Sequence, residues 1–138
     1  MSTAPFIENI LDIELDGAME AHIREGFSYR AILALQEFLQ VTQGELAGAL
    51  GVSRQTLIRH TKQKKARLTP QLSDQLFRVA RIARRAVDVL GGQPNAIEWL
   101  KSPNAALGQR SPLSLLDTDA GSEKVDDVLG RIEYGVYS

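Results

Sequence analysis

The side chains with the clearest chemical purpose are Arg54, Gln55 and Arg59, in the stretch SRQTLIRH. A guanidinium pairs with two acceptors on guanine, and a carboxamide pairs in the same way with adenine. All three residues follow Ser53, a residue type that favours the N-terminus of a helix. This order places them near the start of one short helix, where such a helix meets base edges in the major groove of DNA. We therefore predict that this helix reads DNA sequence.

A second short helix, immediately upstream, is needed to position the first. Leu46, Ala47 and Leu50 share one face at helical spacing. Gly51 follows where a helix end favours a residue that accepts positive φ. Only the three residues from Gly51 to Ser53 separate the two helices. The pattern predicts a helix-turn-helix.

Other polar and basic side chains are suited to phosphate contacts, which position a protein on DNA without reading its sequence. Gln43 stands at the start of the upstream helix, where a side-chain amide and the helix N-terminus both attract an anion. The basic segment KQKKARLTP follows the predicted reading helix and should lie along the DNA backbone. The residues predicted to contact phosphate are Gln43, Thr56, Lys62, Lys64 and Lys65.

Basic charge is concentrated in one part of the chain, although the formal net charge is only −1. Residues 54–85 contain ten basic residues and one acidic residue, a balance of +9. Residues 1–53 and 86–138 are acidic, with balances of −6 and −4. A run of charge alone is usually a solvated face. Its coincidence with the helix-turn-helix favours contact with nucleic acid.

The remaining periodicity predicts an all-α protein. Ser28–Gln40 should form a helix capped by Ser28 that supports the helix-turn-helix. A long amphipathic helix should begin at Thr69-Pro70 and end at Gly91. These elements divide the chain into an acidic arm over residues 1–26, a DNA-binding unit over residues 27–91 and a C-terminal unit over residues 92–138.

The C-terminal unit is predicted to consist of short helices, because prolines interrupt it repeatedly. The expected helices are Pro94–Lys101, Asn104–Leu107, Pro112–Leu116 capped by Ser111, and a last helix from Asp119 or Ser122 to Tyr134. Trp99, the single tryptophan, is expected at the centre of this small core rather than on a ligand platform.

Both ends of the chain leave alternatives open. The arm is expected to contain a helix near Asp16–Glu25, suited either to packing on the DNA-binding unit or to pairing with another subunit. The last residues combine two tyrosines and a glycine. They are suited equally to folding back on their own domain and to inserting into a partner.

Several functional classes lack their usual residues. There is no cysteine, and the two histidines, His22 and His60, are too far apart in sequence to suggest a ligand pair. Neither a G-x-S-x-G serine motif nor a glycine-rich phosphate loop is present. We therefore expect no catalysis, no bound metal and no cofactor. No apolar run approaches the length of a membrane span, and we expect a cytoplasmic protein.

The order of these features resembles the Xre/MbcA/ParS antitoxins that accompany RES-domain toxins. The N-terminal resemblance is carried by GVSRQTLIRH, RLTPQLSDQLFRVARI and the helix that runs to VLGG. The C-terminal resemblance is more specific and lies in AIEWLKSPNAALGQRSPLSLLDTDAGSEKVDDVLGRIEYGV. Two positions depart from the family pattern: Thr61 replaces a residue that is more often apolar, and His60 stands in place of a second arginine.

The resemblance implies an N-terminal Xre-like helix-turn-helix bundle followed by a small α-helical toxin-binding domain. Such proteins bind the promoter of their own operon and neutralise a separate toxin that consumes NAD, by covering its active site. Because a single helix-turn-helix usually needs a second copy for useful affinity, we expect a homodimer on a palindromic site, within a larger complex with the toxin. The C-terminal residues to which this role carries over are Arg131, Glu133, Tyr134, Val136, Tyr137 and Ser138.

A different class of function also accounts for the pattern. A stand-alone transcriptional regulator would use the same helix-turn-helix, with a C-terminal unit that dimerises or senses a small molecule. The absence of a toxin gene beside this one would favour that alternative.

Overall fold

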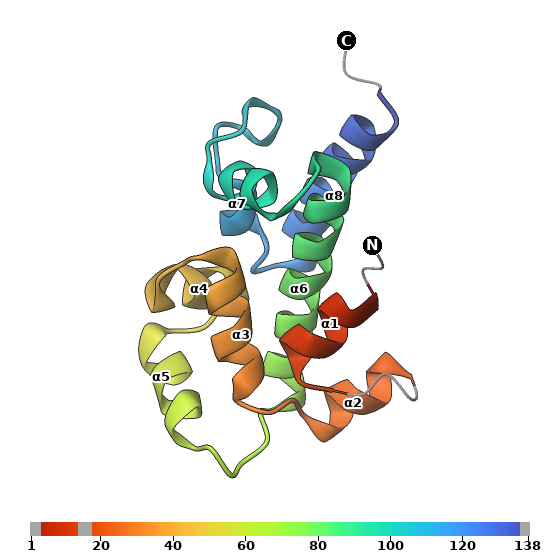
Figure 1. Cartoon of the computed structure of the whole chain (residues 1–138). Helices are drawn as coiled ribbons and strands as arrows, with labels where there is room; N and C mark the ends of the chain where they lie inside the picture. Colours follow the sequence, from red (N-terminus) through yellow and green to blue (C-terminus); the bar gives the residue numbers. More distant parts are fainter. Residues whose placement is uncertain (1–3, 14–17, 136–138) are drawn as a thin grey trace.

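The computed structural model describes residues 4–13 and 18–135, and these are helical with no β-strand (Figure 1). The N-terminal helices are α1 (Ala4–Leu11), α2 (Met19–Glu25), α3 (Arg30–Leu39), α4 (Gln43–Leu50), α5 (Arg54–Lys62) and α6 (Pro70–Leu90). The C-terminal elements are α7 (Gln93–Lys101), the 3-10 helices η1 (Ala105–Leu107) and η2 (Pro112–Leu115), and α8 (Asp119–Glu133). The predicted all-α fold class is confirmed.

Helix α6 is the central helix of the molecule. It begins as predicted, because the Thr69 hydroxyl accepts a hydrogen bond from the Leu72 amide at 3.2 Å and Pro70 occupies the first turn. It ends at Gly91, whose φ is +84°. The apolar stripe along this helix is buried from Leu72 to Ala86. Helix α3 packs against α6, and so do α7 and α8, so one helix joins the two parts of the chain (Figure 1).

Helix α1 was not predicted, and it supplies part of the N-terminal core. Ile7, Ile10 and Leu11 are buried against α3 and α6. The ring of Phe6 meets Phe38 of α3 edge-on, with 4.7 Å between centroids. An eight-residue helix is too short to be stable alone, so its formation depends on this tertiary packing.

Helix α2 occupies the second half of the segment predicted as Asp16–Glu25, and residues 14–17 lie outside the described residues. Met19 and Ile23 are partly buried against the core. The described helices of the acidic arm therefore pack on α3 and α6 of the same chain. This observation accounts for one of the two roles considered for it and leaves pairing between subunits untested.

The chain passes from α2 to α3 through a tightly constrained junction. Gly26 has a φ of +93°, and a Cβ at this position would collide with the carbonyl oxygen of Leu68. Beside it, the amide of Phe27 donates to the hydroxyl of Ser73 at 2.9 Å, and both residues are fully buried. The Phe27 carbonyl accepts from the Leu68 amide at 2.9 Å. These bonds attach Phe27 to α6 and to the segment that precedes it.

The predicted N-cap of α3, Ser28, was wrong by one residue. The helix begins at Arg30, and its N-cap, Tyr29, makes no side-chain capping bond. The Ser28 hydroxyl accepts instead from the Arg30 amide at 3.2 Å, two residues on, so it closes a turn that precedes the helix. Helix α3 buries one apolar face, which includes Ile32 and Leu35.

The C-terminal elements lie close to their predicted positions, and α8 takes the earlier of the two predicted starts, Asp119. The Trp99 prediction was wrong. On α7 the buried side chains are Ala96 and Leu100, four residues apart, so Trp99 falls on the flank of that face and is only partly buried. Leu116 and Leu129 are among the side chains that fill the centre instead.

Gly121, in the first turn of α8, explains how closely this helix approaches η2. A Cβ at this position would overlap the carbonyl oxygen of Leu115. Because glycine has no Cβ, the backbone of α8 can pack directly against the end of η2. Among the described helices, none is both long and apolar enough to cross a membrane.

Candidate functional site

The helix-turn-helix has the predicted construction. Helices α4 and α5 are separated by residues 51–53, and Gly51 adopts the left-handed conformation with a φ of +73°. The Ser53 hydroxyl caps α5 by accepting from the Thr56 amide at 3.1 Å. Leu57 is fully buried, which fixes the rotation of α5 about its own axis. The opposite face of α5 is therefore turned to solvent.

Of the three side chains predicted to read bases, Gln55 and Arg59 lie on that solvent face, and Arg54 lies at the N-terminal end of the helix. Arg54, Gln55 and Arg59 are all exposed. No ion pair or side-chain hydrogen bond joins them to any other residue that the structure describes. Their donors and acceptors remain available to an external partner.

Thr56 retains a donor for phosphate despite its internal bond. Its hydroxyl oxygen accepts from the Ser53 hydroxyl at 2.8 Å, which leaves its own hydroxyl hydrogen free to donate. Lys62, the last residue of this helix, is exposed, and so are Lys64 and Lys65 just beyond it. The Lys64 ammonium also lies 6.0 Å from the centroid of the Tyr29 ring, which holds it near the start of α3.

Gln43 has an acidic neighbour that the sequence interpretation did not weigh. Thr42 and Glu45 form a capping box: the Thr42 amide donates to the Glu45 carboxylate at 2.9 Å, and the Glu45 amide donates to the Thr42 hydroxyl at 3.1 Å. This hydrogen bond from Thr42 is the main cause of the lowered pKa of Glu45. A carboxylate thus already complements the helix dipole. Any phosphate contact here therefore depends mainly on the Gln43 side chain.

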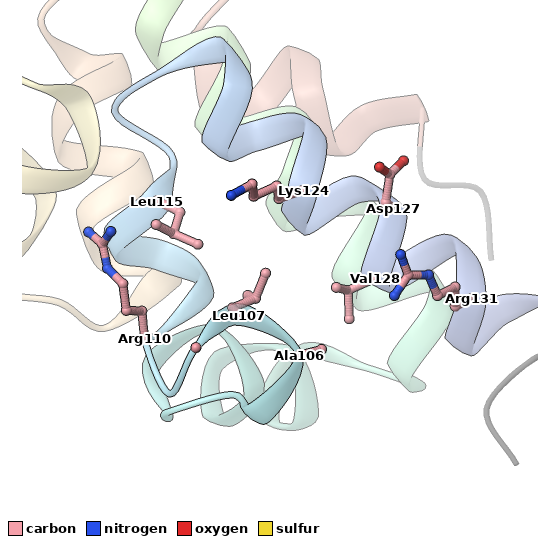
Figure 2. A pocket seen from close by; sticks show the side chains of 9 residues that line it. Ala106, Leu107, Arg110, Leu115, Lys124, Asp127, Val128 and Arg131 are labelled. Carbon is pink, nitrogen blue, oxygen red and sulfur yellow. The ribbon is translucent and has the colours of Figure 1, made fainter.

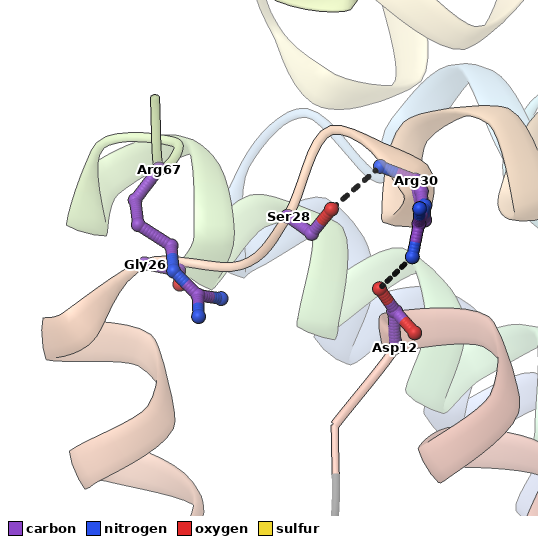
Figure 3. A network of polar contacts seen from close by, with 5 residues as sticks. All are labelled: Asp12, Gly26, Ser28, Arg30 and Arg67. Atoms are coloured by element: carbon purple, nitrogen blue, oxygen red, sulfur yellow. Dashed lines mark hydrogen bonds and ion pairs between the residues drawn. The ribbon is translucent and has the colours of Figure 1, made fainter. Parts of the chain in front are cut away.

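The loop after α5 is anchored to the N-terminal arm (Figure 3). Arg67 lies 3.7 Å from the Glu25 carboxylate and donates to the Gly26 carbonyl at 3.4 Å. Arg30 lies 3.8 Å from Asp12. These two arginines are thus partly neutralised by acids of the arm, while Lys64 and Lys65 have no such partner among the described residues.

The two departures at the end of α5 have local explanations. Burial lowers the pKa of His60, and the neighbouring Arg59 lowers it further, so His60 is neutral near pH 7 and adds no cationic contact. The Thr61 hydroxyl donates to the carbonyl of Ile58 at 2.7 Å. This bond satisfies a polar group at a position that is only partly exposed.

The basic run in the sequence overstates the charge available to DNA. Arg78 lies 2.8 Å from Asp119, and Arg85 lies 2.8 Å from Asp126 and 3.3 Å from Glu133. Both arginines project from α6 and join it to α8. They hold the two parts of the protein together, so the cationic surface is centred on residues 54–67 and not on residues 54–85.

The predicted C-terminal contact residues lie in part at the exposed end of α8. Tyr134 is 78% exposed, and Arg131 is exposed one turn earlier. Glu133 is the residue whose carboxylate faces Arg85, so it already has an internal partner. Val136, Tyr137 and Ser138 lie outside the described residues.

A groove between η1 and α8 was missed from the sequence (Figure 2). It encloses about 430 Å³, and its lining includes Leu107, Arg110, Lys124 and Val128 together with Arg131. Only Arg131 had been singled out. The other residues come from separate segments that an irregular loop brings together, and no local sequence pattern marks them.

Comparison with known proteins identifies the family. The antitoxin Xre-like helix-turn-helix domain matches residues 18–81, and the antitoxin Xre/MbcA/ParS C-terminal toxin-binding domain matches residues 85–135. The first match ends and the second begins within α6. The chain belongs to the Xre antitoxin family, with a helix-turn-helix domain followed by a toxin-binding domain.

Individual relatives support the same assignment. The chain is 37% identical over 117 residues to antitoxin Xre of Yersinia enterocolitica, covering 84% of this chain and 78% of the relative. It is 29% identical over 132 residues to antitoxin Xre of Pseudomonas putida, covering 94% and 81%. A chain of the Mycobacterium tuberculosis MbcT-MbcA toxin-antitoxin complex has the same fold, with a TM-score of 0.57, 22% identity and coverage of 80% of this chain and 96% of that chain.

Proposed function

We propose that this protein is the antitoxin of a type II system, and that it neutralises a RES-domain toxin that degrades NAD. Its C-terminal region would cover the active site of that toxin. Its helix-turn-helix would bind operator DNA and repress its own operon. The observation that carries this proposal is the separation of two exposed surfaces, one on α5 and the other at the end of α8, at opposite ends of the molecule (Figure 1).

The end of α8 has the chemistry to enter a nucleotide cleft. The exposed ring of Tyr134 can stack where a planar nicotinamide would lie, and the exposed guanidinium of Arg131 can pair with phosphate or carboxylate groups. Val136, Tyr137 and Ser138 would extend this contact. Glu133 would contribute indirectly, because its ion pair with Arg85 orients the C-terminal end of α8.

On the DNA side, Arg54, Gln55 and Arg59 would contact bases, and Gln43, Thr56, Lys62, Lys64 and Lys65 would contact phosphates. One helix-turn-helix covers one half-site, so we propose a homodimer on a palindromic operator, within a larger assembly when toxin is bound. A promoter fusion tests autoregulation. Expression of the chain should reduce reporter output, and unchanged output would remove repression from the proposal.

Co-expression with the product of the neighbouring gene tests the antitoxin function. The neighbour alone should stop growth and lower cellular NAD, and this chain should restore both and co-purify with it. A harmless neighbour that does not co-purify would instead favour a stand-alone regulator whose C-terminal unit dimerises or senses a ligand.

A truncation separates the tail from the rest of the C-terminal unit. A chain that ends after Gly135 retains all the described elements, including the partly buried Ile132 and the pair between Arg85 and Glu133. We expect it to bind the toxin and to inhibit it less completely than the full chain, because Arg131 and Tyr134 remain while Val136, Tyr137 and Ser138 are lost. Full inhibition by this truncated chain would show that residues 136–138 do not enter the active site.

A further inference from the structure

The groove between η1 and α8 has two distinct kinds of lining (Figure 2). Leu107, Leu115 and Val128 form an apolar floor, and all three belong to or pack against the hydrophobic core. Arg110, Lys124 and Arg131 stand around it, and each is exposed. A single carboxylate, that of Asp127, lines the same groove and points away from the floor in Figure 2.

The three cations have no internal role. Arg110, Lys124 and Arg131 form no ion pair and no side-chain hydrogen bond with the residues that the structure describes. On the other side of α8, by contrast, Arg85 is paired with both Asp126 and Glu133. The carboxylates of α8 therefore pair with Arg85 of α6. The three cations around the apolar groove are left without an ion pair among the described residues.

The groove is also continuous with the end of α8. Arg131 lines it and lines a second hollow that extends to Tyr134 and Arg85. A partner that contacts Tyr134 would therefore reach the groove without a break in the surface. The recognition helix α5 lies at the far end of the molecule (Figure 1).

We propose that this groove docks an acidic segment of the toxin, with an apolar side chain on the floor and carboxylates against Arg110 and Lys124. The inference rests on the proposed antitoxin function and adds a second contact to it, separate from the tail. The apolar floor favours a protein segment over DNA, because a phosphate backbone has no group to place against Leu107 and Val128. The groove would supply affinity and the tail inhibition.

Charge reversal tests the docking site. The toxin encoded beside this chain is used in a catalytically silent form, and its affinity for the full-length antitoxin is measured. Lys124→Glu and Arg110→Glu should each weaken binding about tenfold, and the double variant should weaken it further and flatten the salt dependence. Arg24→Glu, at an exposed arginine of α2, is the matched control and should bind like the original chain.

Folding is checked by the thermal unfolding midpoint of each variant, which should not change because the substituted side chains are exposed and unpaired. A compensating carboxylate-to-lysine change in the toxin should restore binding to Lys124→Glu. This rescue cannot arise from misfolding.

The possible outcomes are distinct. Toxin that binds the original and the double variant equally overturns the docking site and leaves the antitoxin function standing. Toxin that does not bind the original chain removes the proposed function itself. Loss of operator binding or of self-association in the double variant, with toxin affinity unchanged, would assign the groove to DNA or to a second copy and would also overturn the proposal.

Discussion

Arginines of the same sequence run behave differently on α5 and on α6. On α5, Arg54 and Arg59 are exposed and unpaired among the described residues. On α6, Arg78 and Arg85 reach carboxylates of α8 at 2.8 Å. Arg54 and Arg59 are therefore available to bind an external partner, whereas Arg78 and Arg85 stabilise the packing of α6 on α8. Charge along a sequence therefore locates a cationic stretch but does not say which of its members are free.

The acidic residues show the same division. Asp119, Asp126 and Glu133 of α8 face arginines of α6, so the acidity of the C-terminal unit is partly structural. The cations around the η1 and α8 groove are left over after this pairing. The comparison predicts that changes at paired residues affect stability, whereas changes at unpaired residues affect binding.

The largest effect is expected where α8 meets η2. Gly121→Ala should lower the free energy of unfolding by about 3 kcal/mol, because the added Cβ overlaps the Leu115 carbonyl oxygen. Gly48→Ala, in α4, is the matched control, since a Cβ there meets nothing within 4 Å and alanine favours a helix. Chemical denaturation measures both. Equal effects would mean that α8 does not rest on η2 so closely.

A buried hydroxyl gives the next effect. Ser73→Ala should cost about 2 kcal/mol, because it leaves the buried amide of Phe27 without its acceptor. Ser122→Ala should be neutral or stabilising, because the Ser122 hydroxyl is buried and has no hydrogen-bond partner in the described structure. The measurement is the denaturant concentration at the unfolding midpoint of each variant. A larger loss of stability in Ser122→Ala than in Ser73→Ala would contradict the role given to the Ser73 hydroxyl.

A pair of arginines compares binding with stability directly. Arg54→Ala should weaken operator binding by roughly 1–3 kcal/mol and relax specificity at one base pair, with unfolding unchanged. Arg78→Ala should leave operator binding intact and destabilise the fold by about 1 kcal/mol, since Arg78 also donates to the Leu116 carbonyl at 3.3 Å. Binding isotherms and unfolding curves of both variants test this. If Arg54→Ala destabilised the fold and Arg78→Ala weakened operator binding, the distinction between free and paired arginines would be wrong.

The smallest effect concerns pH. The pKa of His60 is lowered in the folded protein from 6.5, so the unfolded chain binds the proton more readily. Stability should therefore fall as the pH drops below 6.5 and level off beneath the folded pKa. His60→Gln should reduce this fall in the thermal midpoint. An unchanged pH profile would show that burial of His60 has no energetic consequence.

Capping residues explain why much of the fold was predictable from the sequence. Ser53 and Thr69 were recognised as caps, and Gly51 and Gly91 as helix ends, because each acts through its own few neighbours. The Thr42 and Glu45 pair also has the spacing of a capping box, and this local signal was overlooked.

The features that escaped prediction depend on distant contacts. Helix α1 is stabilised by packing on α3 and α6, and the flank position of Trp99 follows from how α7 meets its neighbours. The pairing of Arg85 with Asp126 and Glu133 joins residues far apart in the chain. The groove at Arg110 and Lys124 likewise exists only once η1 folds against α8. Sequence periodicity does not indicate which distant segments come into contact.

The central claim is that separate surfaces bind DNA and inhibit the toxin. The most direct test measures NAD hydrolysis by the purified toxin, with either the Arg54→Ala, Arg59→Ala double variant or a chain that ends after Gly135 and also carries Tyr134→Ala. The account predicts full inhibition by the double variant and poor inhibition by the truncated chain, which should still bind the operator. Loss of inhibition in the double variant, or full inhibition by the truncated chain, would contradict it.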